Sequence, residues 1–369
     1  MADHSDTTGR SGIPGSEGFP IARYALAIGL LLAIYASLRP FSGWHDPGVG
    51  AFAFLSRWAD LDFRNRWDVF LNAAAYSALG CVAVLAVAPR LRGAGALAAC
   101  TALLGLFSVS MEALQTFLPS RSASINDVIT NIAGALAGGV TGVLSVPWFR
   151  AEGGAHGLRR RLFASGPIGD VGLVLIALWL IGLLAPRIVL FGMGDMRLLL
   201  DVKATAASPP ETFIAIEAFV SAANLIAVAL LVRIAAARDA RPAALVLIVV
   251  SLSLLARTFG FGLFWTVANA FNWVTAGAVI GVLVGVPLAL LSLQLPRRAA
   301  PVLAVALLAV TTATINLSPP NPYIWAKPRP TRQSELAPLS VVTRVAAMAW
   351  PLAACGFLLW RRRQEWDSG

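Results

Sequence analysis

The chain has 369 residues, of which 57% are hydrophobic and only 13% are charged, with 29 Lys and Arg against 19 Asp and Glu. Soluble domains carry about 25% charged residues, so this composition excludes an ordinary soluble domain. The cations lie in short clusters between apolar runs, which is typical of loops that set membrane topology rather than of a nucleic-acid-binding surface. We therefore expect an all-α, polytopic membrane protein.

The N-terminal residues 1–20 are rich in Gly, Ser, Thr and Pro, and this composition predicts a disordered tail. The apolar run after Arg23 lacks a clear cleavage site, so we expect an uncleaved first helix. Each membrane span needs about 20 apolar residues. That rule predicts ten spans, near residues 22–38, 69–88, 94–117, 127–147, 170–190, 212–232, 242–257, 273–295, 301–317 and 340–360.

The loops between these spans indicate the organisation of the chain. A basic linker, 148–169, separates a four-helix part, 21–147, from a part of about six helices, 170–369. The short basic loops fall on one side of the membrane, and the positive-inside rule makes that side cytoplasmic. We therefore expect a protein of the bacterial plasma membrane with both termini in the cytoplasm. The segment Phe259–Phe271 is too short to span alone, and it is re-entrant, interfacial or an extension of a neighbouring helix.

Polar residues recur on the second, third and fourth expected helices. Residues three or four apart share one helix face, so each helix carries one polar stripe. The stripes lie near the same surface, which is extracytoplasmic in the orientation above. They consist of Asp68, Asn72 and Tyr76; of Ser108, Glu112 and Gln115; and of Asp127 and Asn131, followed by the helix-packing glycines Gly134, Gly138 and Gly142.

Ionisable side chains inside a membrane span are costly and are functional candidates by default. If the protein is an enzyme, Glu112 and Asp127 are the candidate acid or base. Arg121, in the hairpin between the third and fourth helices, is a candidate for holding an anionic head group. The alternative is structural: Arg121 pairs with Glu112 or Asp127 and only fixes the hairpin.

The remaining sequence gives weaker signals. The cysteines lie singly and the histidines show no ligand spacing, so we expect no metal site, no disulfide and no cofactor. Glu217 and Arg257 fall near the same ends of their helices and are expected either to pair or to extend to the membrane boundary. The loop 317–339, with Tyr323 and Trp325, favours an interfacial anchor over a glycan-stacking surface.

A longer motif runs through the first four helices. It contains Asp68-x3-Asn72-x3-Tyr76 and then Glu112-x2-Gln115-x-Phe117-x-Pro119-x-Arg121-x5-Asp127-x3-Asn131-x2-Gly134-x3-Gly138. Residues 21–147 thereby resemble the VanZ-like family of bacterial membrane proteins. That family is named for a protein linked to lowered susceptibility to the glycopeptide teicoplanin. The resemblance implies an envelope location and a role near cell-wall or lipid-linked glycans, but no defined reaction.

Three functions remain open at this point. The first is an envelope protein that binds or modifies a lipid-linked or cell-wall-related amphiphile at the outer leaflet, through the polar stripes. The second is a secondary transporter, which the position of the stripes near one surface disfavours. The third is a non-catalytic scaffold. The expected partners are membrane lipids and a lipid-linked glycan, not nucleic acid, and the oligomeric state is open.

Overall fold

The computed structural model describes residues 19–56, 66–88, 90–150, 154–185, 188–197, 209–319, 321 and 336–367. The expected N-terminal tail and most of the loop 317–339 lie outside these ranges. The described chain is helical and contains no β-strand. Its helices are α1 (Pro20–Leu38), α2 (Arg66–Val87), α3 (Gly93–Gln115), α4 (Ile125–Arg150), α5 (Ala155–Leu162), α6 (Pro167–Leu183), α7 (Pro210–Ala235), α8 (Pro242–Phe264), α9 (Ala276–Ser292), α10 (Ala300–Leu317) and α12 (Ala337–Asp367), with 3₁₀ turns η1 (Ala53–Ser56) and η3 (Val267–Asn269).

The all-α membrane architecture expected from the composition is confirmed. In the described ranges, 8 helices are long and apolar enough to cross a membrane, and α6 and α9 are shorter apolar helices of 17 residues each. The segment Phe259–Phe271 begins as an extension of the preceding helix, because α8 continues to Phe264. It then forms the turn η3.

One predicted boundary was wrong. The span expected over 170–190 ends as a helix at Leu183, and the described residues that follow, up to Arg197, are irregular. The sequence places Pro186 just after this end. A proline lacks the amide hydrogen that would continue the helix and restricts the residue before it.

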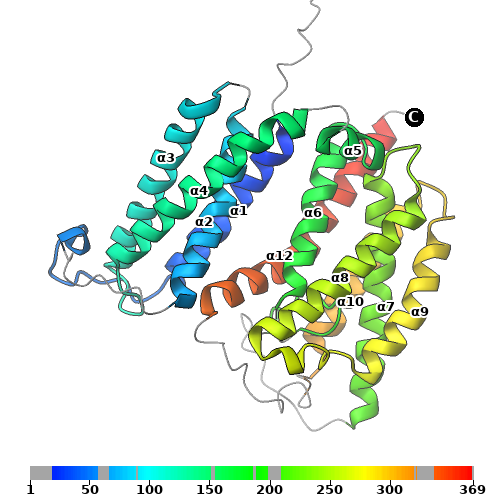
Figure 1. Ribbon diagram of the computed structural model, residues 1–369. Coiled ribbons are helices and arrows are strands. Elements are labelled where there is room, and N and C mark those ends of the chain that lie inside the picture. Colours follow the sequence, from blue (N-terminus) through cyan, green and yellow to red (C-terminus); the bar gives the residue numbers. More distant parts are fainter. Residues whose placement is uncertain are drawn as a thin grey trace, which may run out of the picture.

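The helices form two groups, α1–α4 and α6–α12, which lie side by side in Figure 1. Each group buries an apolar core of its own: one gathers around Tyr76 and Leu104, the other around Trp179 and Trp350. Helix α1 connects them, because it packs against α6 and α12 as well as against α2. The expected linker includes the short basic helix α5, whose Arg159 pairs with Asp170 of α6.

The basic loops meet at one end of the bundle, shown at the top of Figure 1. The Ala164 amide, between α5 and α6, donates to the Ala235 carbonyl at the end of α7. Arg233 of α7 donates to the Leu295 carbonyl after α9. The hairpin that joins α3 to α4 lies at the opposite end, so this structure separates the cationic loops from the polar stripes.

Helices α2 and α4 pack with their backbones in contact. A Cβ atom at Gly134 or Gly138 would overlap main-chain atoms of Ala73 or Ser77 in α2, and one at Gly142 would lie 2.8 Å from the Cys81 carbonyl oxygen. Small residues allow this close approach where helices associate in lipid. The glycine stripe therefore sets the distance between the helices that carry Asn72 and Asp127.

Gly138→Ala is expected to destabilise the folded protein by about 1–3 kcal/mol, since the added methyl group must push α4 away from α2. Gly356→Ala in α12 is the matched control, because a Cβ there meets no atom within 4 Å. Thermal denaturation of both variants in the same detergent measures the difference. Equal melting temperatures would contradict the packing described here.

Candidate functional site

The polar stripes of the first four helices meet through hydrogen bonds. Ser108 of α3 lies at the centre of the deepest contacts: Asn131 Nδ2 donates to its Oγ at 2.9 Å, and the Tyr76 hydroxyl forms a side-chain hydrogen bond with it. Asn131 Oδ1 is inaccessible and has no hydrogen-bond partner among the described residues. One residue from each of α2, α3 and α4 therefore meets at the same level.

A second level lies nearer the α3–α4 hairpin. The Asn72 amide donates a hydrogen bond to the Asp127 carboxylate, and this joins α2 to α4. The charges of Asp68 and Glu112 also act on this region, because Asp68 interacts electrostatically with Asp127 and both aspartates interact with Glu112. Three acidic groups thus gather at one end of three helices, a concentration of hydrogen-bond acceptors.

Glu112 fixes the start of α4. Its Oε2 atom accepts a hydrogen bond of 2.8 Å from the main-chain amide of Ser124, the residue before α4 begins. This bond satisfies one of the amides that have no partner within a helix. Glu112 is buried, so the carboxyl group lies inside the cluster rather than in solvent.

The hairpin is held to α1 by a guanidinium and an amide. Arg121 donates to the main-chain carbonyls of Ala36 at 2.6 Å and of Arg39 at 3.2 Å, and Gln115 Nε2 donates to the Ser37 carbonyl at 3.1 Å. These carbonyls end α1 and lack helical partners. Burial, and then the charge of Arg39, lowers the pKa of Arg121, while Glu112 opposes that shift.

These contacts correct the structural alternative, in which Arg121 pairs with Glu112 or Asp127. Neither carboxyl group forms an ion pair within the described ranges, and each accepts from a neutral donor instead. The physical reason is that the guanidinium is bound by main-chain carbonyls of α1. Holding an anionic head group with Arg121 stays a prediction.

The loop from 41 to 56 covers the hairpin. The His45 amide donates to the Phe117 carbonyl at 3.1 Å, and Thr116 Oγ1 donates to the Ala51 carbonyl at 3.2 Å. Phe54 of η1 is buried with Ala113 and Val128. On the outer side Trp44 is 43% and Phe52 is 58% exposed. Exposed aromatic side chains of this kind are typical of the membrane–water boundary.

An apolar groove follows α3 and α4 on their exposed side. It is lined by Leu97, Thr101, Gly105, Ile132 and Leu136. Thr101 Oγ1 is inaccessible and has no partner in the described part of the chain. The groove is a different feature from the polar cluster, and it gives α3 a face toward the hydrocarbon.

The structure thus links eight of the nine polar and charged candidates through direct or electrostatic contacts: Tyr76, Ser108 and Asn131 at the deeper level, Asp68, Asn72, Glu112 and Asp127 nearer the hairpin, and Arg121 at its rim. The ninth, Gln115, donates to the Ser37 carbonyl of α1 instead. Sequence reasoning missed the groups that they contact: the Ser124 amide, the last carbonyls of α1 and the loop over the hairpin. No residue type marks a main-chain carbonyl or amide that needs a partner. The only signal available was indirect: an Arg and a Gln that the helix hairpin places beside the end of another helix. No group of His, Cys, Asp and Glu in the described ranges is arranged to hold a metal ion.

These observations define a membrane protein of the multi-helix class, whose first four helices enclose an acidic, hydrogen-bonded cluster near one end. Residues 21–145 match the family model described as VanZ/LLP1. The match confirms the resemblance seen in the sequence for the N-terminal part, and it does not extend to the helices from α5 onward. No curated protein and no solved structure gave a match.

Ser108→Ala is expected to destabilise the protein by about 0.5–2 kcal/mol, because interhelical hydrogen bonds in membranes are worth that much. Asn131→Ala should cost a similar amount. The double variant should cost less than the sum, since both single changes remove the same bond. Thermal unfolding of the four proteins gives the coupling energy. Strict additivity would show that Ser108 and Asn131 do not interact.

Proposed function

We propose that the protein binds or modifies an amphiphile with a polar, lipid-linked or cell-wall-related head group, at the extracytoplasmic side of the bacterial plasma membrane. One observation carries the proposal: the cluster holds more hydrogen-bond acceptors than donors. Its acidic groups include Glu112 and Asp127, neither of which forms an ion pair in the described ranges, and the inaccessible Asn131 Oδ1 accepts nothing there.

The chemistry of this excess indicates the head group. Carboxylates and amide oxygens accept hydrogen bonds, so a molecule rich in hydroxyl groups complements them. A glycan meets that requirement. At the rim, the charges of Arg39 and Arg121 interact with each other. Two adjacent guanidinium groups suit a phosphate between the glycan and a lipid chain.

The position of the cluster supports binding at a boundary rather than transport. Asp68, Asp127 and Glu112 all lie within the first or last turn of their helices. Transporter sites usually lie near the middle of the bilayer. The basic loops occupy the opposite end of the bundle and favour a cytoplasmic location for that end. The orientation of the chain is part of the proposal.

Glu112→Gln and Asp127→Asn are expected to weaken binding of a polyprenyl-phosphate-linked sugar at least tenfold. Each change replaces one carboxyl oxygen by an amide nitrogen that cannot accept, and leaving a buried hydrogen-bonding group unsatisfied costs roughly 1–3 kcal/mol. Polyprenyl phosphate without the sugar should bind the variants almost as well as the wild type. Native mass spectrometry of the protein with each lipid measures both affinities.

Asp239→Asn is the matched control, because Asp239 is an exposed acid at the other end of the bundle. It should leave both affinities unchanged. Melting temperatures of all variants separate loss of binding from loss of folding. Folded Glu112→Gln and Asp127→Asn proteins that keep full affinity for the sugar-bearing lipid would rule out this site.

The VanZ-like resemblance extends the proposal to glycopeptide susceptibility. If the cluster acts on a cell-wall precursor, cells that produce the protein should tolerate more teicoplanin than cells that lack it. The Asp127→Asn variant should then lose most of this difference while inserting normally. Inhibitory concentrations of teicoplanin across the three strains measure it, and identical values in all three would remove the link.

A further inference from the structure

Exposed arginines gather at one end of the second helix group, where its short loops meet at the top of Figure 1. Their side chains form no hydrogen bond or ion pair with any residue that the structure describes. They are Arg160 and Arg161 at the end of α5, Arg238 and Arg241 between α7 and α8, and Arg297 and Arg298 between α9 and α10. Like charges repel, so an anion placed among them is favourable.

Main-chain hydrogen bonds hold two of these segments together. The Ala237 amide donates to the Leu162 carbonyl at 3.0 Å, within an antiparallel pair. Because the two chains run in opposite directions, the residue before Leu162 and the residue after Ala237 lie at the same end of the pair. These residues are Arg161 and Arg238. The fold therefore places two guanidinium groups side by side from segments far apart in the sequence.

The third segment joins the same surface through α7. Arg233, near the end of α7, donates to the Leu295 carbonyl at 2.8 Å, two residues before Arg297. The charge of Arg297 also interacts with that of Arg233. Hydrogen bonds thus fix the ends of α5, α7 and α9 against one another. The exposed arginines that they carry form one surface, which we call the basic end.

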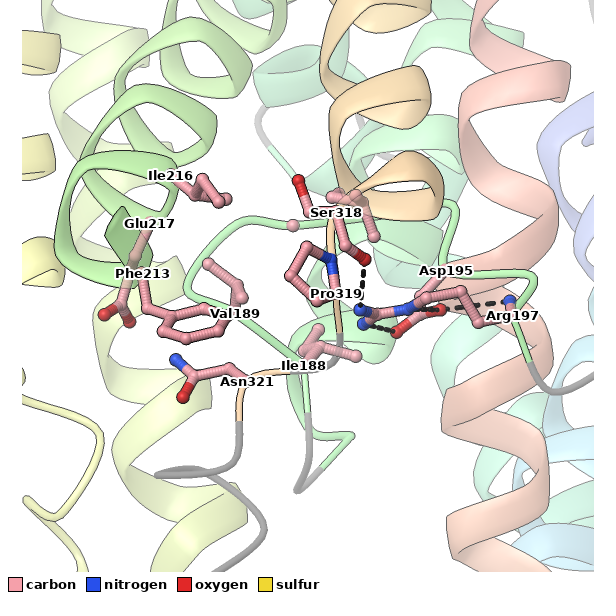
Figure 2. Close-up of a pocket in the computed structure, with 12 residues that line it drawn as sticks. Ile188, Val189, Asp195, Arg197, Phe213, Ile216, Glu217, Ser318, Pro319 and Asn321 are labelled. Carbon is pink, nitrogen blue, oxygen red and sulfur yellow. Dashed lines mark hydrogen bonds and ion pairs between the residues drawn. The ribbon is translucent and has the colours of Figure 1, made fainter. Parts of the chain in front are cut away.

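Arginines elsewhere in the described ranges have protein partners. Arg197 donates to the Asp195 carboxylate, as Figure 2 shows. Arg257, expected to pair with Glu217 or to extend to the membrane boundary, is buried: its charge interacts with Glu217 and it donates to main-chain carbonyls after α6. At the basic end the exposed Asp239 forms no ion pair with the described arginines. An anion from outside the chain would supply the missing partner.

Helix α5 places an apolar side chain beside these charges. Leu158 is 56% exposed and shares a helix face with Arg161, three residues later. Arg159 pairs with an aspartate of α6, and this contact fixes the orientation of α5. The start of α5 also lies against Trp148, which is 58% exposed at the end of α4. Exposed leucine and tryptophan side chains next to arginines are typical of the boundary between hydrocarbon and lipid head groups.

We propose that the basic end binds an anionic phospholipid, with the phosphate between Arg161 and Arg238 and an acyl chain against Leu158. Guanidinium groups bind phosphate through paired, charge-assisted hydrogen bonds. A zwitterionic head group brings a cation of its own, which the arginines repel, whereas a phosphatidylglycerol head group carries only the negative charge. The apolar contact favours a lipid over free phosphate. This site lies at the opposite end from the acidic cluster and does not depend on its function.

The test compares dioleoyl-phosphatidylglycerol with dioleoyl-phosphatidylcholine, which have the same chains and differ in net charge. Native mass spectrometry of the purified full-length protein should show at least tenfold tighter binding of phosphatidylglycerol. Arg161→Gln and Arg238→Gln should each weaken that binding about fivefold, and the double variant about 25-fold. Arg90→Gln is the matched control, because Arg90 is an exposed arginine in the α2–α3 loop of the other helix group. It should change nothing.

Both arginines are exposed and make no side-chain contact that folding needs, so unchanged melting temperatures are expected. Raising the salt from about 0.1 M to about 0.5 M should weaken phosphatidylglycerol binding to the wild type more than to the double variant. Equal binding of the two lipids, full affinity in the double variant, or binding of glycerol phosphate as tight as that of the lipid would overturn the proposal. Glu112→Gln should not alter phosphatidylglycerol binding, so failure of the acidic cluster and failure of this site give different results.

Discussion

Main-chain carbonyls and amides without a helical partner are the constraint on which this structure depends. Hydrocarbon offers them no hydrogen bonds, so each break in a membrane helix must be satisfied by the protein itself. The chain uses arginines for this, and two of them hold irregular segments. Arg121 binds the last carbonyls of α1, and Arg257 binds the carbonyls that follow α6. In both places the guanidinium fixes a segment of main chain outside the helices.

The two helix groups solve the same problem with different surroundings. In the first group the segment is a short hairpin, covered by the loop from 41 to 56, and the acids gather from three helices near one end. In the second group the segment lies inside the bundle, and Ser221 of α7 donates to its Leu190 carbonyl. Helix α1 packs against both groups.

The sequence predicts much of the fold because hydrophobic runs of about 20 residues have one physical meaning. It also predicts the polar stripes, since residues three or four apart must share a helix face. It does not predict the role of Arg121, because its partners are main-chain carbonyls of Ala36 and Arg39, which no residue type marks. The end of α6 was missed although Pro186 follows it, because Ile188, Val189 and Leu190 are apolar again and hydropathy does not distinguish a helix from buried irregular backbone. The irregular segment after α6 is held by distant residues, such as Arg257 of α8 and Ser221 of α7, and spacing alone does not give these contacts.

The glycine contacts between α2 and α4 have a mechanical consequence. Because Gly134 and Gly138 hold these two backbones against each other, any separation of the pair would expose carbonyl oxygens to hydrocarbon. We therefore expect α2 and α4 to move as one rigid unit. Helix α3 meets α4 more loosely, since at Gly105 only the flexible side chain of Ile132 is near. Any movement within the first four helices would therefore displace α3 before it separated α2 from α4.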